Sequence, residues 1–298
     1  MPRKRSTNMS NVLINGQHLI DIADAIRAKN GTEETYKISE MAQAIEDIPS
    51  GGFSIEDFFN HTYYDEKNIV FNNVKSLFPY CFYNNTTLES FSSDSVTSLS
   101  TYSGGAGSYV FAKCSNLKSV SIPNIKGTGS GGHQFDSCIS LTDVYMPSAS
   151  IGQYMFSGCK SLVNIALPHI GNAVGMNNYG FQNCTSLEKV DLGTTKLANG
   201  EFSGCVKLTT LILRRENGIC TNGNSNNFNN TPFASGGAGG EIYIPKVLYD
   251  HLGDGTALDY KSASKWTTID GYGTITWKQI EGSQYEHYYA DGTPITEE

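Results

Sequence analysis

Cysteine and histidine are the side chains in this 298-residue chain best suited to bind a metal. The seven cysteines are an odd number, and none forms a C-x-x-C pair, the spacing that zinc sites commonly use. The six histidines are scattered through the chain, and no two have the spacing of metal ligands. The sequence therefore predicts no metal site. The cysteines occupy positions 81, 114, 138, 159, 184, 205 and 220.

Motifs that would indicate catalysis or a cofactor are also missing from the sequence. There is no G-x-S-x-G nucleophile elbow, no H-E-x-x-H helix and no P-loop. Residues 127–132 match G-x-G-x-x-G, but a dinucleotide site needs this motif at the start of a helix in a βαβ unit. Here the motif lies in a loop between two copies of a sequence phrase that recurs along the chain. We therefore expect a protein that is not an enzyme and has no cofactor.

Composition narrows the class of protein further. Apolar residues make up 39% of the chain and charged residues only 17%, which favours short strands and many turns over helical bundles. The formal net charge of −8 argues against a nucleic-acid partner. No apolar stretch is long enough to insert in a membrane. Residues 1–10 form a basic, flexible tail without the apolar region of a signal peptide, so we expect synthesis in the bacterial cytoplasm without secretion by that route.

One phrase recurs along the middle of the chain. It reads FAKCSNLKSVSIP from Phe111 and returns as FDSCISLTDVYMP and FSGCKSLVNIALP. The intervals between successive phenylalanines are 29, 24, 21, 25 and 21 residues, which lie in the range of leucine-rich repeats. The copies begin at Phe82 (a degenerate copy), Phe111, Phe135, Phe156, Phe181 and Phe202.

The phrase predicts a stack of coils with a shared core. Its last two apolar positions alternate, as a short strand with one buried face requires. One coil cannot bury its own apolar face, so neighbouring coils stack and the phenylalanines line the inside. The third residue after each phenylalanine is a small, readily buried cysteine, and we interpret the set as a ladder of reduced thiols, with disulfides or a metal as the alternatives. The ladder consists of Cys114, Cys138, Cys159, Cys184 and Cys205, with Asn85 in this place in the first copy.

The consensus F-x-x-C-x-x-L-x-x-[VI]-x-[ILM]-P resembles the BspA-like leucine-rich repeat family. Residues 74–82 and 151–156 resemble the V-x-x-I-G-x-x-A-F segment that precedes each repeat in that family. The resemblance implies a mainly β repeat solenoid of about six coils over residues 74–245, preceded by a linker and first strand at 51–73. Members of the family are typically surface adhesins or proteins of phages and prophages.

The two ends are expected to differ from the solenoid. Residues 11–50 contain two amphipathic helical patterns whose amino-acid sequence resembles a short N-terminal module of phage tail-associated proteins. The alternative is a helical hairpin that caps the solenoid. Residues 246–298 are expected to form a C-terminal cap, with Trp266 and Trp277, and a polar tail.

Candidate binding residues come from positions that align in stacked coils. Two residues before each phenylalanine lies a column of Tyr80, Tyr109, His133, Tyr154 and Tyr179. Aromatic rings with polar tips suit contact with a protein or a sugar, whereas packing between coils is the structural alternative. A second column, expected to face outward from the strands, has no consistent chemistry: Ser121, Tyr145, Ala166, Asp191 and Ile212. The Gly- and Asn-rich insertions, including 216–240, are either binding loops or disordered.

Three functions fit these patterns. The first is a tail-associated protein of a phage or prophage, located in the virion, whose N-terminal module attaches to other tail or baseplate proteins and whose solenoid binds a host surface protein or glycan. The second is a bacterial adhesin at the cell surface, and the third is an intracellular interaction scaffold. No trimerising segment is visible, so the sequence leaves the oligomeric state open, a homotrimer included.

Overall fold

The chain divides into two units, Met1–Thr62 and Tyr63–Glu298, and the helices and strands described below belong to the second. A computed structural model describes residues 67–71, 74–77, 79–99, 108–125, 132–149, 151–167, 178–193, 196–197, 199–215, 218–222, 225–234, 236–261, 275–281, 287–288 and 294–295. The helical module expected at 11–50 and Trp266 lie outside these residues.

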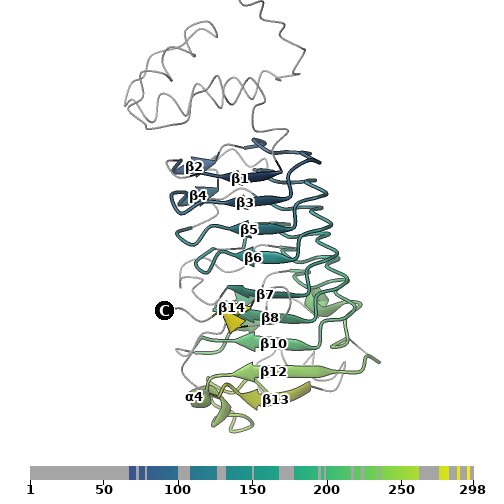
Figure 1. The fold of residues 1–298 in the computed structure, drawn as a ribbon. Coiled ribbons are helices and arrows are strands. Elements are labelled where there is room, and N and C mark those ends of the chain that lie inside the picture. Colours follow the sequence, from purple (N-terminus) through teal and green to yellow (C-terminus); the bar gives the residue numbers. More distant parts are fainter. Residues whose placement is uncertain are drawn as a thin grey trace, which may run out of the picture. The chain divides into compact units, whose positions relative to one another are not determined.

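The second unit is a mainly β solenoid whose coils stack along one axis (Figure 1). Each coil contributes one strand, parallel to the strand of the next coil, and the strands form two sheets of order β1-β3-β5-β6 and β13-β12-β10-β8-β7. The first sheet contains β1 (Asn68–Val70), β3 (Ser90–Ser92), β5 (Ser119–Ser121) and β6 (Asp143–Tyr145). The second contains β7 (Asn164–Leu167), β8 (Lys189–Leu192), β10 (Thr210–Leu213), β12 (Gly240–Ile244) and β13 (Ile275–Gln279).

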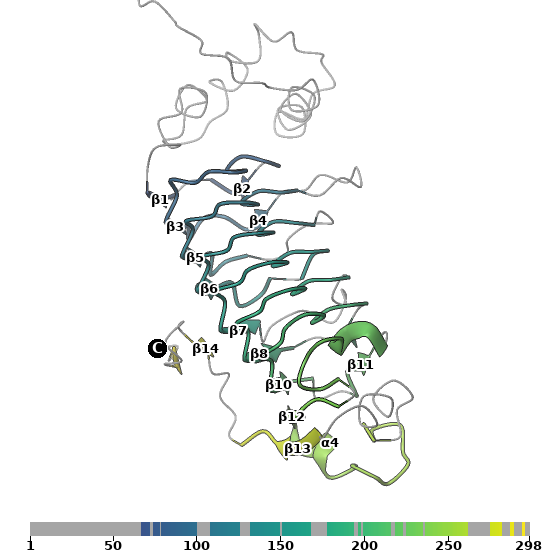
Figure 2. The same ribbon diagram turned by 90° about the vertical axis from the view of Figure 1, so that its right-hand side faces the viewer.

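Shorter elements complete the coils (Figure 2). Two pairs of two-residue strands run parallel to each other, and a small antiparallel pair lies near the C-terminus. These pairs are β2 (Ser76–Leu77) with β4 (Ser98–Leu99), β9 (Lys196–Leu197) with β11 (Thr221–Asn222), and β14 (His287–Tyr288) with β15 (Pro294–Ile295). The helical elements of the described ranges are the 3-10 turn η1 (Ser225–Phe228) and the short helix α4 (Lys246–Tyr249).

The repeated phenylalanines form one continuous stack inside the solenoid, as the phrase predicts. All are buried, and successive rings from Phe82 to Phe202 lie 5.1 to 5.7 Å apart with interplanar angles of at most 11°. Parallel strands repeat at about 4.8 Å, so a ring at the same place in each coil must meet its neighbour nearly face to face. The strand residues behind the rings are also buried, except Val144, which is half-buried.

Opposite the sheets, the segment around each phenylalanine builds a second hydrogen-bonded ladder, here called the turn face. The N–H groups two residues before, at, and two residues after the phenylalanine donate to carbonyls of the next coil; for Phe156 the acceptor is Gly180 O, at 2.8 Å. This geometry puts the two flanking positions in the left-handed region in six successive coils, from that of Phe82 to that of Phe202. In the coil of Phe156 these positions are Tyr154, with φ 53°, and Gly158, with φ 71°.

The Asn-rich insertion contains a further coil that the sequence analysis missed. Phe228 extends the phenylalanine stack, with its ring centroid 5.5 Å from that of Phe202. Carbonyls on either side of Phe228 accept the hydrogen bonds of the turn-face ladder, and Asn230 has the expected positive φ of 56°. Thr231 then stands in the cysteine place, and its hydroxyl donates to Phe228 O at 2.7 Å.

The C-terminal segment continues the sheet before it departs from the repeat. β13 pairs with β12 in parallel, and Trp277 takes the inward position next to Ile242. The buried Tyr260 ring packs on Trp277, with centroids 5.2 Å apart, and its hydroxyl accepts a hydrogen bond from Cys220 N at 2.7 Å. The apolar interior is therefore covered at this end by an added strand and two large aromatic side chains.

Candidate functional site

The aromatic column on the turn face is a continuous stack of rings. Successive rings from Tyr80 to Tyr179 lie 4.5 to 5.2 Å apart with interplanar angles of 12 to 18°, and each side chain is half-buried. The last ring lies over Gly200, where a Cβ atom would come within 2.4 Å of ring carbons of Tyr179. The ring faces between Tyr80 and Tyr179 are thus occupied by neighbours, which leaves mainly edges and polar tips for any ligand.

A structural reason for this column follows from its backbone. The left-handed region is unfavourable for bulky side chains, so tyrosine there needs compensation. Stacking on the rings above and below supplies it, and the next coil has glycine at the same place. Burial, followed by the negative charge of Asp136, raises the pKa of Tyr109. The prediction that these five residues bind a ligand remains a prediction.

The cysteine ladder has a specific hydrogen-bonding role. All seven cysteines are buried thiols outside any disulfide. In each of five coils, the cysteine sulfur donates to the carbonyl of the phenylalanine in the preceding coil, as Cys159 Sγ does to Phe135 O at 3.2 Å. That carbonyl already accepts the backbone N–H of the residue at the cysteine position of its own coil, which is Asn85 in the coil of Phe82. Each thiol therefore donates a second hydrogen bond to a phenylalanine carbonyl that takes no part in the strand ladder or the turn-face ladder.

These thiols are poor nucleophiles and poor metal ligands. Burial raises the pKa of Cys114 and of Cys220 to about 12, so the reactive thiolate is scarce at neutral pH. Across the described ranges, no group of three or more His, Cys, Asp or Glu side chains is arranged to hold a metal ion. Within those same ranges, no helix has both the length and the apolar character to cross a membrane.

The second candidate surface is the outer side of the two sheets, here called the strand face. The pairing places Ser121 beside Tyr145, and Ala166, Asp191 and Ile212 in one row, as expected for an outward column. The outward orientation does not leave the column exposed in its C-terminal half, where these last three residues are buried. One cause is β14, which lies against β7 in both views (Figure 1 and Figure 2).

Asp191 is also covered by an ion pair on the strand face. Arg214 binds it through two parallel hydrogen bonds, Nε to Oδ1 at 2.7 Å and Nη2 to Oδ2 at 2.6 Å. The Asp191 side chain is inaccessible to solvent, and only 9% of the Arg214 side chain is exposed. A bidentate pair in a region of low dielectric is geometrically strict, so Arg214 has a fixed orientation.

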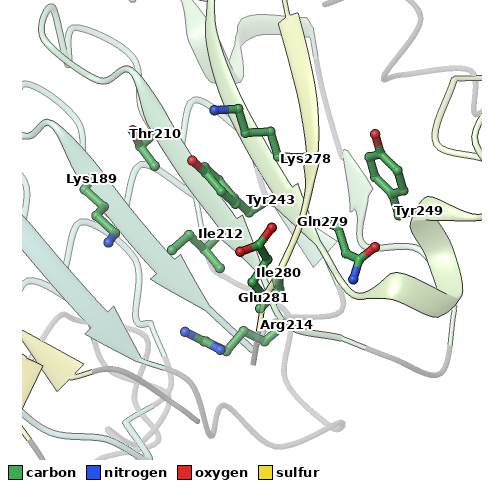
Figure 3. Close-up of a pocket in the computed structure, with 10 residues that line it drawn as sticks. All are labelled: Lys189, Thr210, Ile212, Arg214, Tyr243, Tyr249, Lys278, Gln279, Ile280 and Glu281. Atoms are coloured by element: carbon green, nitrogen blue, oxygen red, sulfur yellow. The ribbon is translucent and has the colours of Figure 1, made fainter. Parts of the chain in front are cut away.

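Beside this pair the strand face is hollowed into a pocket of about 850 Å³ (Figure 3). Strands β8, β10, β12 and β13 form its floor, and α4 with the residues after β13 forms a wall. Tyr243 stands near the centre of the view, with Ile212 on one side and Gln279 on the other, and Tyr249 stands apart on α4. The lining residues are Lys189, Thr210, Ile212, Arg214, Tyr243, Tyr249, Lys278, Gln279, Ile280 and Glu281.

Three of the side chains around this pocket hold one another in place. Lys278 Nζ lies 2.6 Å from Glu241 Oε1, and the Tyr243 hydroxyl donates to Glu241 Oε2 at 2.7 Å. The same ammonium lies 5.6 Å from the centre of the Tyr243 ring. The hydrogen bonds of Lys278 and Tyr243 lower the pKa of Glu241, and the bond to Glu241 raises the pKa of Tyr243. At neutral pH this cluster therefore has an ionised carboxylate, an ammonium and a protonated phenol.

This site could not be found from the repeated phrase, because most of its lining residues lie outside that phrase. Tyr243 follows the buried Ile242 in β12, so alternation alone places it outward, next to Ile212. The strand that includes Lys278 and Gln279 carries no phrase and was expected only as part of a cap. Comparing the outward residues of adjacent strands would have found Ile212, Tyr243 and Lys278 in one row.

The family of the chain is shown by a family model, that of the BspA type leucine-rich repeat region, which matches residues 47–149 and 128–236 in six copies. The chain belongs to the BspA type leucine-rich repeat family. The resemblance expected from the phrase is therefore confirmed, as is the mainly β solenoid that it implies.

Two solved structures are similar to this BspA type protein. A leucine-rich repeat protein of T. pallidum is 24% identical, over 53% of this chain and 74% of that one, with a TM-score of 0.42. A leucine-rich repeat protein of Bacteroides ovatus is 20% identical, over 60% of this chain, with a TM-score of 0.39. The chain spans 52% of the length of the second protein. No curated protein matches.

Proposed function

We propose that this BspA type protein is a tail-associated, receptor-binding protein of a phage or prophage that acts by binding and not by catalysis. In this proposal, residues 11–50 attach the chain to other tail or baseplate proteins, and the strand face of the solenoid contacts a ligand on the host cell surface. Membership of this repeat family supports a role in binding other molecules. The amino-acid sequence of residues 11–50 supports the association with a phage tail.

The observation that carries the binding role is the strand-face pocket. Its floor is drawn from four strands, so a rigid stack of coils fixes the relative positions of its side chains. Its polar groups are already oriented by Asp191 and Glu241, which lowers the entropy lost on binding. Core positions repeat the same residue type in coil after coil, whereas the lining positions differ. Specificity for a ligand would be encoded in such positions.

Particle composition and cell attachment together test the proposal. Antibody against the solenoid should label the tails of phage particles induced from the strain that carries the gene. Fluorescently labelled full-length protein should bind a subset of host strains and compete with adsorption of the particle. Protein that is absent from particles and binds no host strain would contradict both parts of the proposal. Surface labelling of intact bacteria without particles would instead support an adhesin.

A further inference from the structure

The strand-face pocket has the composition of a carbohydrate site. Its charged groups balance: three cations (Lys189, Arg214 and Lys278) and one anion (Glu281) line it, and two further anions pair with these cations, Asp191 with Arg214 and Glu241 with Lys278. Two of the cations have their counterions beside them within 2.6 Å, so the pocket presents fixed hydrogen-bonding groups without a net charge. This pattern suits a ligand with many hydroxyl groups and no charge of its own.

The apolar part of the lining consists of two tyrosines and two isoleucines, Tyr243, Tyr249, Ile212 and Ile280. Tyr249 on α4 is 37% exposed, and Tyr243 is half-buried under the ammonium of Lys278. Ile212, by contrast, is only 7% exposed and offers little area. A protein partner commonly inserts an aromatic or aliphatic anchor into a desolvated apolar pocket, whereas most lining residues here are polar or charged. An amphipathic ring such as tyrosine instead gives a flat apolar face with a polar tip, which a sugar ring can contact with its C–H groups.

The size of the pocket fits more than one sugar unit. Ligand pockets usually measure about 300–1,000 Å³, and this one, at about 850 Å³, lies near the upper end. A second hollow of about 400 Å³ adjoins it and shares Thr210, with Glu241 and Thr276 in its lining. A chain of sugars could thus continue from one hollow to the next across β12 and β13.

We propose that the pocket between β8 and β13 binds an uncharged oligosaccharide, with Tyr249 contacting a sugar ring and Lys189, Arg214, Tyr243, Lys278 and Gln279 binding hydroxyl groups. This proposal rests on the proposed function, because it names the ligand class of the same site. The glycan of a host surface is the source of such a ligand that the proposed function requires.

The test uses the full-length chain, an array of uncharged oligosaccharides and matched uronate-bearing oligosaccharides, and isothermal titration of the best binders. Wild type should bind at least one uncharged class. Tyr249→Ala should weaken that binding about tenfold or more, because it removes an exposed contact of the order of 1.4 kcal/mol. Val247→Ala is the matched control: Val247 is 47% exposed on the same helix and does not line the pocket, so binding should not change. Thermal unfolding should be alike for the three proteins.

The dependence of binding on salt concentration distinguishes an uncharged ligand from a charged one. Raising the salt concentration from about 0.05 M to about 0.5 M screens charge–charge attraction, so binding of an uncharged oligosaccharide should change less than about twofold. Binding confined to uronate-bearing sugars, with a steep loss in salt, would overturn the proposal. So would uncharged-sugar binding that survives both Tyr249→Ala and Lys189→Ala.

Cell attachment separates this proposal from the function on which it rests. If Tyr249→Ala abolishes attachment to host cells but no uncharged oligosaccharide binds, the ligand class is wrong and the receptor-binding role stands. If an uncharged oligosaccharide binds at the pocket but the protein neither joins particles nor attaches to cells, the pocket assignment stands and the receptor-binding role is wrong.

Discussion

The turn face and the strand face use side chains in opposite ways. On the turn face the same residue types recur from coil to coil, and rings, thiols and N–H groups contact the neighbouring coils. On the strand face the outward residues differ from strand to strand, and toward the C-terminal end they surround a pocket. Repetition thus marks residues that hold the stack together, and variation marks residues available for recognition. The comparison can be tested by changing one face at a time.

The largest expected effect comes from the phenylalanine stack. Phe156→Ala removes a fully buried ring from between Phe135 and Phe181, and the coils on either side hold each other too firmly to close the gap. We expect the free energy of unfolding to fall by about 3–5 kcal/mol. Urea denaturation followed by circular dichroism measures this loss. A loss below about 1 kcal/mol would mean that the stack is not the main source of cohesion between coils.

A smaller effect is expected at the thiol ladder. Cys159→Ala removes the sulfur and its hydrogen bond to Phe135 O, and we expect a loss of about 1–2 kcal/mol. Cys159→Ser keeps a donor for that carbonyl and should cost less than the alanine variant. The same urea experiment compares the two. If serine is the more harmful change, the thiol acts through its apolar volume and not through its hydrogen bond.

The smallest effect is expected on the surface, where Glu89 pairs with Lys67 and Lys118 across three coils. The bond to Lys118, then that to Lys67, lowers the pKa of Glu89 from its ordinary 4.5 to about 2. A lowered pKa in the folded state stabilises the fold above pH 4.5, and this contribution is lost as the pH falls toward 2.

Glu89→Gln should therefore lower the melting temperature slightly at pH 7, and the difference from wild type should vanish as the pH falls from 4.5 to 2. Exposed pairs contribute little, so added salt should also reduce the difference. Melting curves across this pH range provide the measurement. A difference that grows on acidification would show that the pair is not responsible.

The features of the turn face could be predicted from the sequence to a larger extent than those of the strand face. The Phe-to-Pro phrase predicted the strand positions, the buried phenylalanines and the reduced thiols, because repeated core positions leave a periodic pattern. One further coil could not be recognised from the phrase. Its segment Phe228-Asn-Asn-Thr231 keeps the phenylalanine ring and the turn but has threonine in place of the cysteine that marks the other copies.

The pocket could not be predicted in the same way. It depends on which outward residues become neighbours, and that depends on the pairing of β12 with β13, a strand that carries no repeat. Ile212 and Tyr243 are 31 residues apart along the chain but lie side by side because β10 pairs with β12. Side chains that do not recur produce no periodic pattern in the sequence, so their proximity can be recognised only in the folded structure.

The most direct test of this division measures stability and ligand binding in parallel for Tyr154→Ala on the turn face and Tyr249→Ala on the strand face. Tyr154 stacks on His133 and Tyr179, so its loss should lower the free energy of unfolding by about 1–3 kcal/mol and leave binding to host cells unchanged. Tyr249→Ala should leave stability unchanged and abolish or strongly weaken binding. If Tyr154→Ala instead abolishes binding with no loss of stability while Tyr249→Ala binds normally, the ligand site lies on the aromatic column of the turn face and the account is wrong.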